Sequence, residues 1–269
     1  MEHSLYNGTY IFDGFPPKHI LYISLIQLSK FGTIAFFVLA GFLLGDKFTT
    51  YSSWEYFKRR VSNTFKPWLI WSLVLVFAIL AQRYVAIRKS GDEYNFFSEL
   101  ISKIELVYLY TNYWFIINFM FCIAILLCFK RYLYSFWLGA CLLICSLIYS
   151  INVQYEWFIP SHTIAIFGFI FYLWLGSMCN YYWHQIDVFF RKTNISLFVI
   201  IFLTTYAWAI FDITALMKIK SVDPYNTLRL SNILYSVATL ALLLKIRSFP
   251  FTEKLKPRKS TYGIYLIQY

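Results

Sequence analysis

A cluster of cations directly before an apolar segment is the part of this sequence best suited to chemistry. Lys58, Arg59 and Arg60 are consecutive, Lys66 follows, and Pro67 opens a long apolar run. Guanidinium groups bind phosphate bidentately, and a helix that begins at Pro67 would add the positive end of its dipole. The cluster therefore predicts a site for a phosphate-bearing cofactor, such as a nucleotide or a coenzyme A thioester. The same cations would also suit topological anchors that contact anionic lipid headgroups.

The elements that position this cluster are predicted to be transmembrane helices. Of 269 residues, 59% are hydrophobic and only 14% are charged, whereas soluble domains carry about a quarter charged residues. Seven stretches supply the ~20 largely apolar residues that a spanning helix needs: approximately 31–48, 67–86, 114–129, 132–150, 163–182, 195–216 and 230–246. These stretches are apolar all round, so lipid is their solvent. The predicted fold is all-α, a polytopic transmembrane helical bundle of about seven complete spans plus the start of another.

The distribution of Lys and Arg predicts which ends of the spans face the cytoplasm. One alternating set of connections, which includes 46–66 and 245–260, holds 15 of the 24 Lys and Arg residues in far less sequence than the other set. By the positive-inside rule this basic set faces the cytoplasm. The net charge of +11 thus reflects membrane topology, and no nucleic-acid partner is predicted.

The chain is predicted to form a single integral-membrane domain over residues 1–269. It has no low-complexity linker and no visible repeat. The one sizeable outer loop contains FFSELISKIELVYLY, whose apolar residues recur at helical spacing, and this predicts a short interfacial helix.

Four segments together resemble the integral-membrane acyltransferase 3 family. The span FGTIAFFVLAGFLLGDKF and the basic run FKRRVSNTFKPWLIWS are similar to the family's FFVLSGFLL span, short basic loop and Pro-aromatic helix start. YLYTNYWFIINFMFCIAIL resembles its Leu-Trp-Phe-rich span, FIFYLWLGSMCNYY its span ending in a Leu-Gly turn, and KSTYGIYLIQY its SYGIYLIH segment. Each motif alone is degenerate, but the four occur in the family's order over essentially the whole chain.

The resemblance implies an enzyme of the plasma membrane, the bacterial inner membrane, that transfers an acyl group, usually acetyl, from cytosolic acyl-coenzyme A to a hydroxyl of a cell-envelope saccharide. It implies no metal. The histidine that ends the family's first helix is the proposed catalytic base, and His3 in MEHS is the matching position. A pKa near neutrality suits removal of a hydroxyl proton. Lys58, Arg59, Arg60 and Lys66 would bind the donor's phosphates.

The sequence also departs from the family's pattern. The family's Arg-x-x-Arg falls on Arg60 and Asn63, so the second arginine is replaced; Ala40 stands where serine is usual and Gln268 where histidine is common. The resemblance further leads us to expect a chain incomplete at both ends, lacking most of the first helix and stopping at Tyr269 inside another. In that form we expect little activity.

Three further polar residues are candidates for the acceptor side. Asp212 lies inside a predicted span near its outer end, where an ionisable residue indicates function. His162 is placed at the outer start of a span, and Glu156 is the only formal charge in its loop. Interfacial or loop-capping roles are the more common ones for residues such as Glu156 and His162.

Two other functions stay open at this stage. A small transporter of sugars or lipid-linked sugars would also use many aromatic spans, although few ionisable residues lie at midspan, where transport sites place them. An inactive remnant of an acyltransferase would account for Asn63, Ala40 and Gln268.

Overall fold

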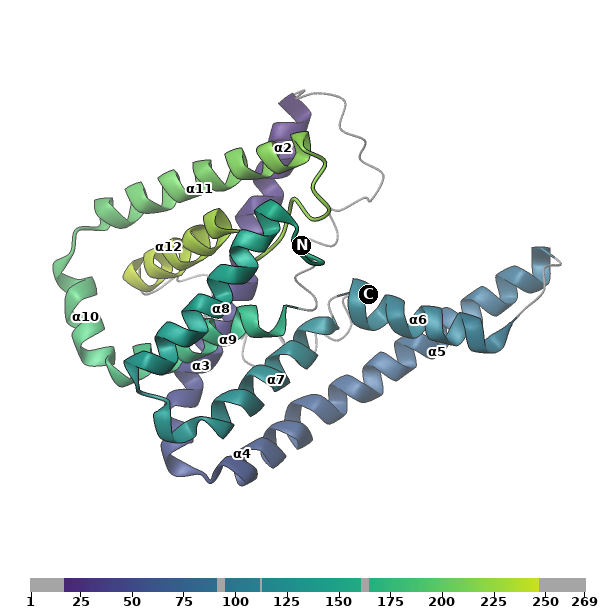
Figure 1. The fold of residues 1–269 in the computed structure, drawn as a ribbon, viewed down its shortest axis with the longest axis horizontal. Coiled ribbons are helices and arrows are strands. Elements are labelled where there is room, and N and C mark those ends of the chain that lie inside the picture. The colour runs from purple at the N-terminus through teal and green to yellow at the C-terminus, as the bar shows by residue number, and fades with distance from the viewer. Residues whose placement is uncertain (1–16, 91–94, 112, 161–164, 247–269) are drawn as a thin grey trace. The chain divides into compact units, whose positions relative to one another are not determined.

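The computed structural model describes residues 17–90, 95–111, 113–160 and 165–246, and these ranges are helical with no strand (Figure 1). The all-α prediction is confirmed. His3, His162 and Gln268 lie outside the described residues. The helices form two compact units, one made of residues up to Thr50 and from Phe129 to Arg247, the other containing Tyr51–Cys128.

The first unit contains seven α-helices and a short 3-10 turn in its described residues. They are α2 (Pro17–Ser29), α3 (Gly32–Thr50), η2 (Lys130–Tyr132), α8 (Phe136–Tyr155), α9 (Ile166–Tyr181), α10 (Trp183–Lys192), α11 (Ile195–Lys218) and α12 (Leu230–Ile246). The described part of the second unit contains α4 (Ser53–Arg60), the π-helix η1 (Val61–Phe65), α5 (Lys66–Ser90), α6 (Phe96–Tyr110) and α7 (Trp114–Cys128).

Each of the seven predicted apolar stretches contains an α-helix within the described residues. Four segments of the described chain are long and apolar enough to cross a membrane: Ile20–Phe48, Ser53–Lys89, Phe136–Tyr155 and Ile195–Lys218. The α6 and α7 pair, bent by 64°, makes a fifth candidate, and α9 and α12 are shorter apolar helices. The first span is longer than predicted, because residues 17–29, which lie outside the seven predicted stretches, form α2.

The closest helix pairing in the first unit is that of α3 and α9, and it depends on small residues. A Cβ atom added to Gly41 would lie 1.9 Å from the carbonyl oxygen of Leu173, and one added to Gly176 would lie 1.9 Å from that of Val38. The hydroxyl of Ser177 donates to the Gly41 carbonyl at 3.1 Å. Gly41 and Gly45, four residues apart, form a small-xxx-small motif. The Gly41 end of this motif packs against another helix of the same chain, as such motifs do between spanning helices.

The next small residue of that motif, Gly45, faces α9 one turn further along. A Cβ atom on Gly45 would lie 2.8 Å from the side chain of Asn180. The Tyr134 hydroxyl donates to the Gly45 carbonyl at 3.4 Å, and its ring stacks on Tyr181 at 4.5 Å. Burial raises the pKa of Tyr134, and its neighbours Asp46 and Tyr181 add to the effect. The hydroxyl thus stays protonated and remains a donor.

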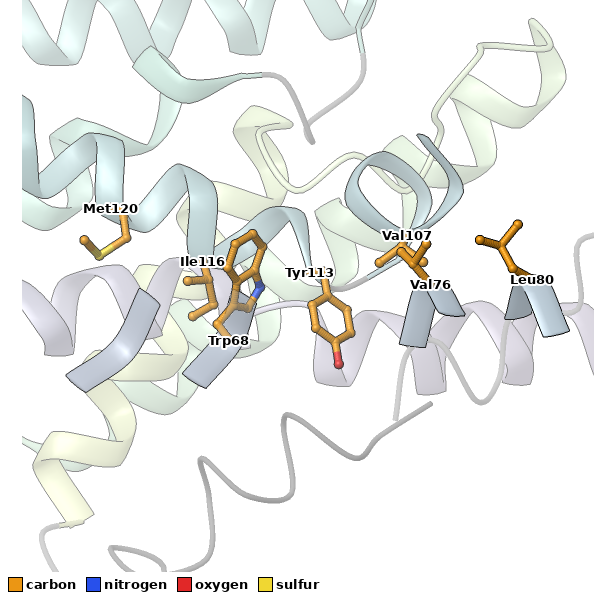
Figure 2. Packing of buried hydrophobic residues seen from close by; sticks show 7 residues of the cluster. All are labelled: Trp68, Val76, Leu80, Val107, Tyr113, Ile116 and Met120. Atoms are coloured by element: carbon orange, nitrogen blue, oxygen red, sulfur yellow. The ribbon is translucent and has the colours of Figure 1, made fainter. Parts of the chain in front are cut away.

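The second unit has its own apolar core, formed by α5, α6 and α7 (Figure 2). Its buried residues are Trp68, Val76, Leu80, Val107, Tyr113, Ile116 and Met120. The predicted helix FFSELISKIELVYLY is confirmed as α6, which begins after Asn95 because the side chain of Asn95 accepts a hydrogen bond from the Ser98 N–H at 3.2 Å. This core holds the first turns of α5, next to the basic cluster.

Replacement of Gly41 by alanine tests the α3–α9 pairing. The new methyl group meets backbone, which cannot rotate away, so we expect Gly41→Ala to lower the free energy of unfolding by about 1–3 kcal/mol. Gly32→Ala is the control, since nothing lies within 4 Å of a Cβ atom there. Thermal unfolding of both variants in the same detergent measures the difference, and equal Tm values would contradict the close packing.

Candidate functional site

The basic cluster, defined as Lys58, Arg59, Arg60 and Lys66, lies within one continuous helical segment. Val61 and Lys66 both have right-handed helical backbone angles, and the Lys66 N–H bonds to the Val61 carbonyl, five residues back. In a regular α-helix the ring of Pro67 would clash with the carbonyl of Asn63, and the π-helical turn relieves that clash. The prediction that a helix begins at Pro67 was wrong, and no free helix amino end adds charge there.

Two arginines of the basic cluster are held by tyrosines. Arg59 donates to the Tyr51 hydroxyl at 3.2 Å, lies over that ring at 4.4 Å and forms an ion pair with Glu55 at 3.2 Å. Arg60 donates through Nε to the Tyr56 hydroxyl at 2.5 Å, with its guanidinium 5.3 Å from the centre of that ring. Both guanidinium groups are therefore oriented before any ligand binds.

Among the described residues, carboxylates balance only part of the positive charge of the basic cluster. Within the described residues, no carboxylate forms an ion pair with Lys58, Arg60 or Lys66. Lys58 and Lys66 are exposed. The apolar helix that carries them has 37 residues and is roughly 55 Å long, well beyond the ~30 Å of hydrocarbon. Since cations are costly in hydrocarbon, we expect this end of the helix to lie outside it.

A second group of polar side chains is buried in the first unit around Arg229. This side chain is completely buried just before α12. It donates to the carbonyls of Asn226 and Ala209 and to the side chain of Gln27, each at 3.1 Å. It also lies 3.6 Å from the carboxylate of Asp212. The guanidinium is thus compensated by one charge and three further acceptors, as burial requires.

Asp212 is the residue through which this network joins three helices. Its carboxylate accepts hydrogen bonds from Ser231 of α12 at 2.5 Å and from Gln154 of α8 at 3.0 Å. The side-chain amide of Gln27, on α2, donates a hydrogen bond to Asn232 at 2.9 Å, so α2 also belongs to the network. We call these six residues, Gln27, Gln154, Asp212, Arg229, Ser231 and Asn232, the polar network. The side chain of Asp212 stays 13% exposed, so one edge of the network is accessible.

Glu156 lies close along α8 to the network member Gln154. It ends α8 in the left-handed conformation, with a φ of 50°. Its carboxylate accepts hydrogen bonds from the hydroxyl of Ser221 and the N–H of Val222, both at 2.8 Å. Glu156 therefore stabilises the connection between α11 and α12. This is the loop-capping role that the sequence left open for Glu156. Acceptor-side roles for Glu156 and Asp212 stay predictions.

Of the six members of the polar network, only Asp212 was singled out from the sequence. Arg229 and Gln27, which bond to each other, both lie outside the seven predicted apolar stretches. A signal was present, because the polar run from Asn226 to Arg229 and the pair Ser231 and Asn232 interrupt an otherwise apolar region. The pairing of Arg229 with Asp212, across 17 residues and two helices, becomes visible only in the folded unit.

A double-mutant cycle tests the polar network. Arg229→Met leaves the carboxylate of Asp212 and several acceptors without their donor, so we expect a loss of about 3–5 kcal/mol in the free energy of unfolding. Asp212→Asn in the same chain should recover at least about 1 kcal/mol. The control is Arg191→Gln, which breaks the exposed pair with Asp187 and should cost about 0–1 kcal/mol. Strictly additive effects of the first two changes would contradict the network.

Comparison with known proteins agrees with the resemblance carried by the four segments. A family model described as an acyltransferase domain, that of the acyltransferase 3 family, matches residues 1–269. No match was found among curated proteins or among solved structures. Since the family model covers all the residues of the printed sequence and several of its helices can span a membrane, we conclude that the protein belongs to the acyltransferase 3 family of membrane acyltransferases.

Proposed function

We propose that the protein transfers an acyl group, acetyl in the first instance, from cytosolic acyl-coenzyme A to a hydroxyl of a cell-envelope saccharide. The observation that carries this proposal is the basic cluster in a member of this family, where Lys58, Arg60 and Lys66 have no carboxylate partner among the described residues. Coenzyme A is a polyanion, and its phosphates are the chemistry such a surface selects.

The cations of the basic cluster would contribute to donor binding in different ways. Arg60 uses only Nε on Tyr56, so its two terminal nitrogens can bind one phosphate as a fork. Lys58 and Lys66 would act as flexible point charges on the others. Arg59 is already shared with Glu55 and would contribute less. Asn63, where the family has its second arginine, is exposed and would offer an amide in place of a guanidinium.

The chemical step would need a base, an acceptor hydroxyl and the donor thioester. We assign the base to His3, by its match to the family position. It would remove the hydroxyl proton as the oxygen attacks the thioester carbonyl, and then return that proton to the departing thiolate of coenzyme A. No metal is required by this scheme. Asp212, Glu156 and His162 remain the candidates that would contact the saccharide.

We place the protein in the bacterial inner membrane with the basic cluster on the cytoplasmic side. The support is the excess of Lys and Arg in the set of connections that contains the cluster. Donor binding on that side would match the location of acyl-coenzyme A, and the connection between α11 and α12 would then lie on the opposite, envelope side.

Replacement of Arg60 by glutamine tests donor binding, and Arg88 in the same helical segment provides the control. Arg88 repeats the geometry at the other end of the same helical segment, where it donates to the Tyr84 hydroxyl at 2.9 Å and lies 5.3 Å from that ring. We expect Arg60→Gln to weaken acetyl-coenzyme A binding about tenfold or more, since a charge-assisted hydrogen bond to phosphate is lost. Arg88→Gln should leave binding unchanged.

Isothermal titration of the purified protein in nanodiscs, at low and at high salt, measures both affinities. The difference between the variants should shrink as salt screens the charges. Equal affinities for the Arg60→Gln and Arg88→Gln variants would remove the basic cluster from the donor site.

A further inference from the structure

The indole N–H of Trp68 is an unusual feature of the second unit. Trp68 is only 2% exposed, yet its Nε1 atom has no acceptor among the described residues. A buried tryptophan normally donates to a neighbouring oxygen, and an exception calls for an explanation such as a ligand. The uncharged indole N–H of Trp68 can therefore donate a hydrogen bond to an oxygen that does not belong to the described chain.

The surroundings of Trp68 are aromatic and apolar. Its ring lies 5.0 Å from that of Phe65, 5.4 Å from that of Tyr108 and 6.3 Å from that of Tyr113, and Figure 2 shows it beside Ile116 in the core of the unit. The hydroxyl of Tyr108 is shared with Ser72 at 2.8 Å. A ligand group that is already ionised when it binds would be costly in this place, so the oxygen that suits the indole is a neutral one, such as a carbonyl oxygen.

Trp68 is also close in sequence to the basic cluster. It follows Lys66 by two residues and lies just beyond the π-helical turn that ends at Phe65, a feature that often marks functional sites. Phe65 and Tyr108, which pack over the indole, are themselves partly exposed. The indole is thus covered by side chains that reach the surface of the unit.

We propose that the Trp68 N–H donates a hydrogen bond to the carbonyl oxygen of the donor thioester. This assignment rests on the proposed function, in which the cations bind the phosphates and the acyl end enters the aromatic core. When the acceptor hydroxyl attacks, its proton passes to the base, the new C–O bond forms and negative charge gathers on this carbonyl oxygen. The C–S bond then breaks and the thiolate takes up the proton. A fixed donor stabilises the charged oxygen more than the carbonyl.

Trp68→Phe tests the proposal, because it removes the N–H and keeps an aromatic ring. The matched control is Trp54→Phe, since Trp54 belongs to the same unit and is 73% exposed. We expect Trp68→Phe to weaken binding of acetyl-coenzyme A about tenfold, while binding of coenzyme A itself, which has no thioester carbonyl, stays unchanged. Arg60→Gln, in contrast, should weaken the binding of both ligands equally.

A change in packing is separated from loss of the N–H by a second replacement. 3-Benzothienylalanine incorporated at position 68 has the shape of tryptophan and a sulfur atom in place of the N–H, and it should give the same selective loss with an unchanged Tm. Unaltered affinity for acetyl-coenzyme A in both variants would overturn the assignment and point to a buried water as the partner. An equal loss for both ligands would overturn it as well. If the wild-type protein bound neither ligand, the proposed function itself would fail, and this assignment with it.

Discussion

Hydrocarbon offers no hydrogen bonds, so every polar group within a membrane-spanning unit must find its partner inside the protein. This constraint explains the first unit. The backbones of α3 and α9 approach closely at Gly41 and Gly176, which have no side chains. Because of this close approach, the hydroxyl of Ser177 donates a hydrogen bond to a carbonyl of α3. Arg229 is tolerated at complete burial because Asp212 and three further acceptors surround it. Four helices are joined through these polar contacts, which apolar side chains alone would join less specifically.

The same constraint makes the exceptions informative. Lys58, Arg60 and Lys66 carry charge that no carboxylate of the described chain balances, and they lie at the end of a helix too long to be covered by lipid. Trp68 keeps a buried donor without an acceptor. Proteins break local rules mainly at functional sites. Both exceptions fall within the same short stretch, from the end of α4 to the first turn of α5, where a polyanionic acyl donor would find its phosphate and carbonyl partners.

Much of the architecture was predictable, because apolar stretches of spanning length are a strong local signal. The seven apolar stretches and the helix now labelled α6 were predicted as helical from short windows of sequence, although only four segments of the described chain, or five with the α6 and α7 pair, are long and apolar enough to cross a membrane. The helix start predicted at Pro67 was wrong, because a proline that follows polar residues normally starts a helix. Here a π-helical turn of five residues continues the helix up to Pro67, and that turn depends on all five residues together. Residues 17–29 were missed as a helix because polar positions dilute their apolar pattern. The Asp212–Arg229 pair could not be foreseen, because its partners are distant in sequence and come together only when α11 packs on α12.

The proposed donor of the transferred group is acyl-coenzyme A. Membranes that contain the protein, incubated with radiolabelled acetyl-coenzyme A, should place the label on envelope polysaccharide as an ester that mild alkali releases, whereas membranes lacking the protein should not. Transfer of label would be expected to fall in the Arg60→Gln protein and to persist in the Arg88→Gln protein. Absence of label from the polysaccharide, with intact protein present and acetyl-coenzyme A unconsumed, would contradict acyl transfer from this donor.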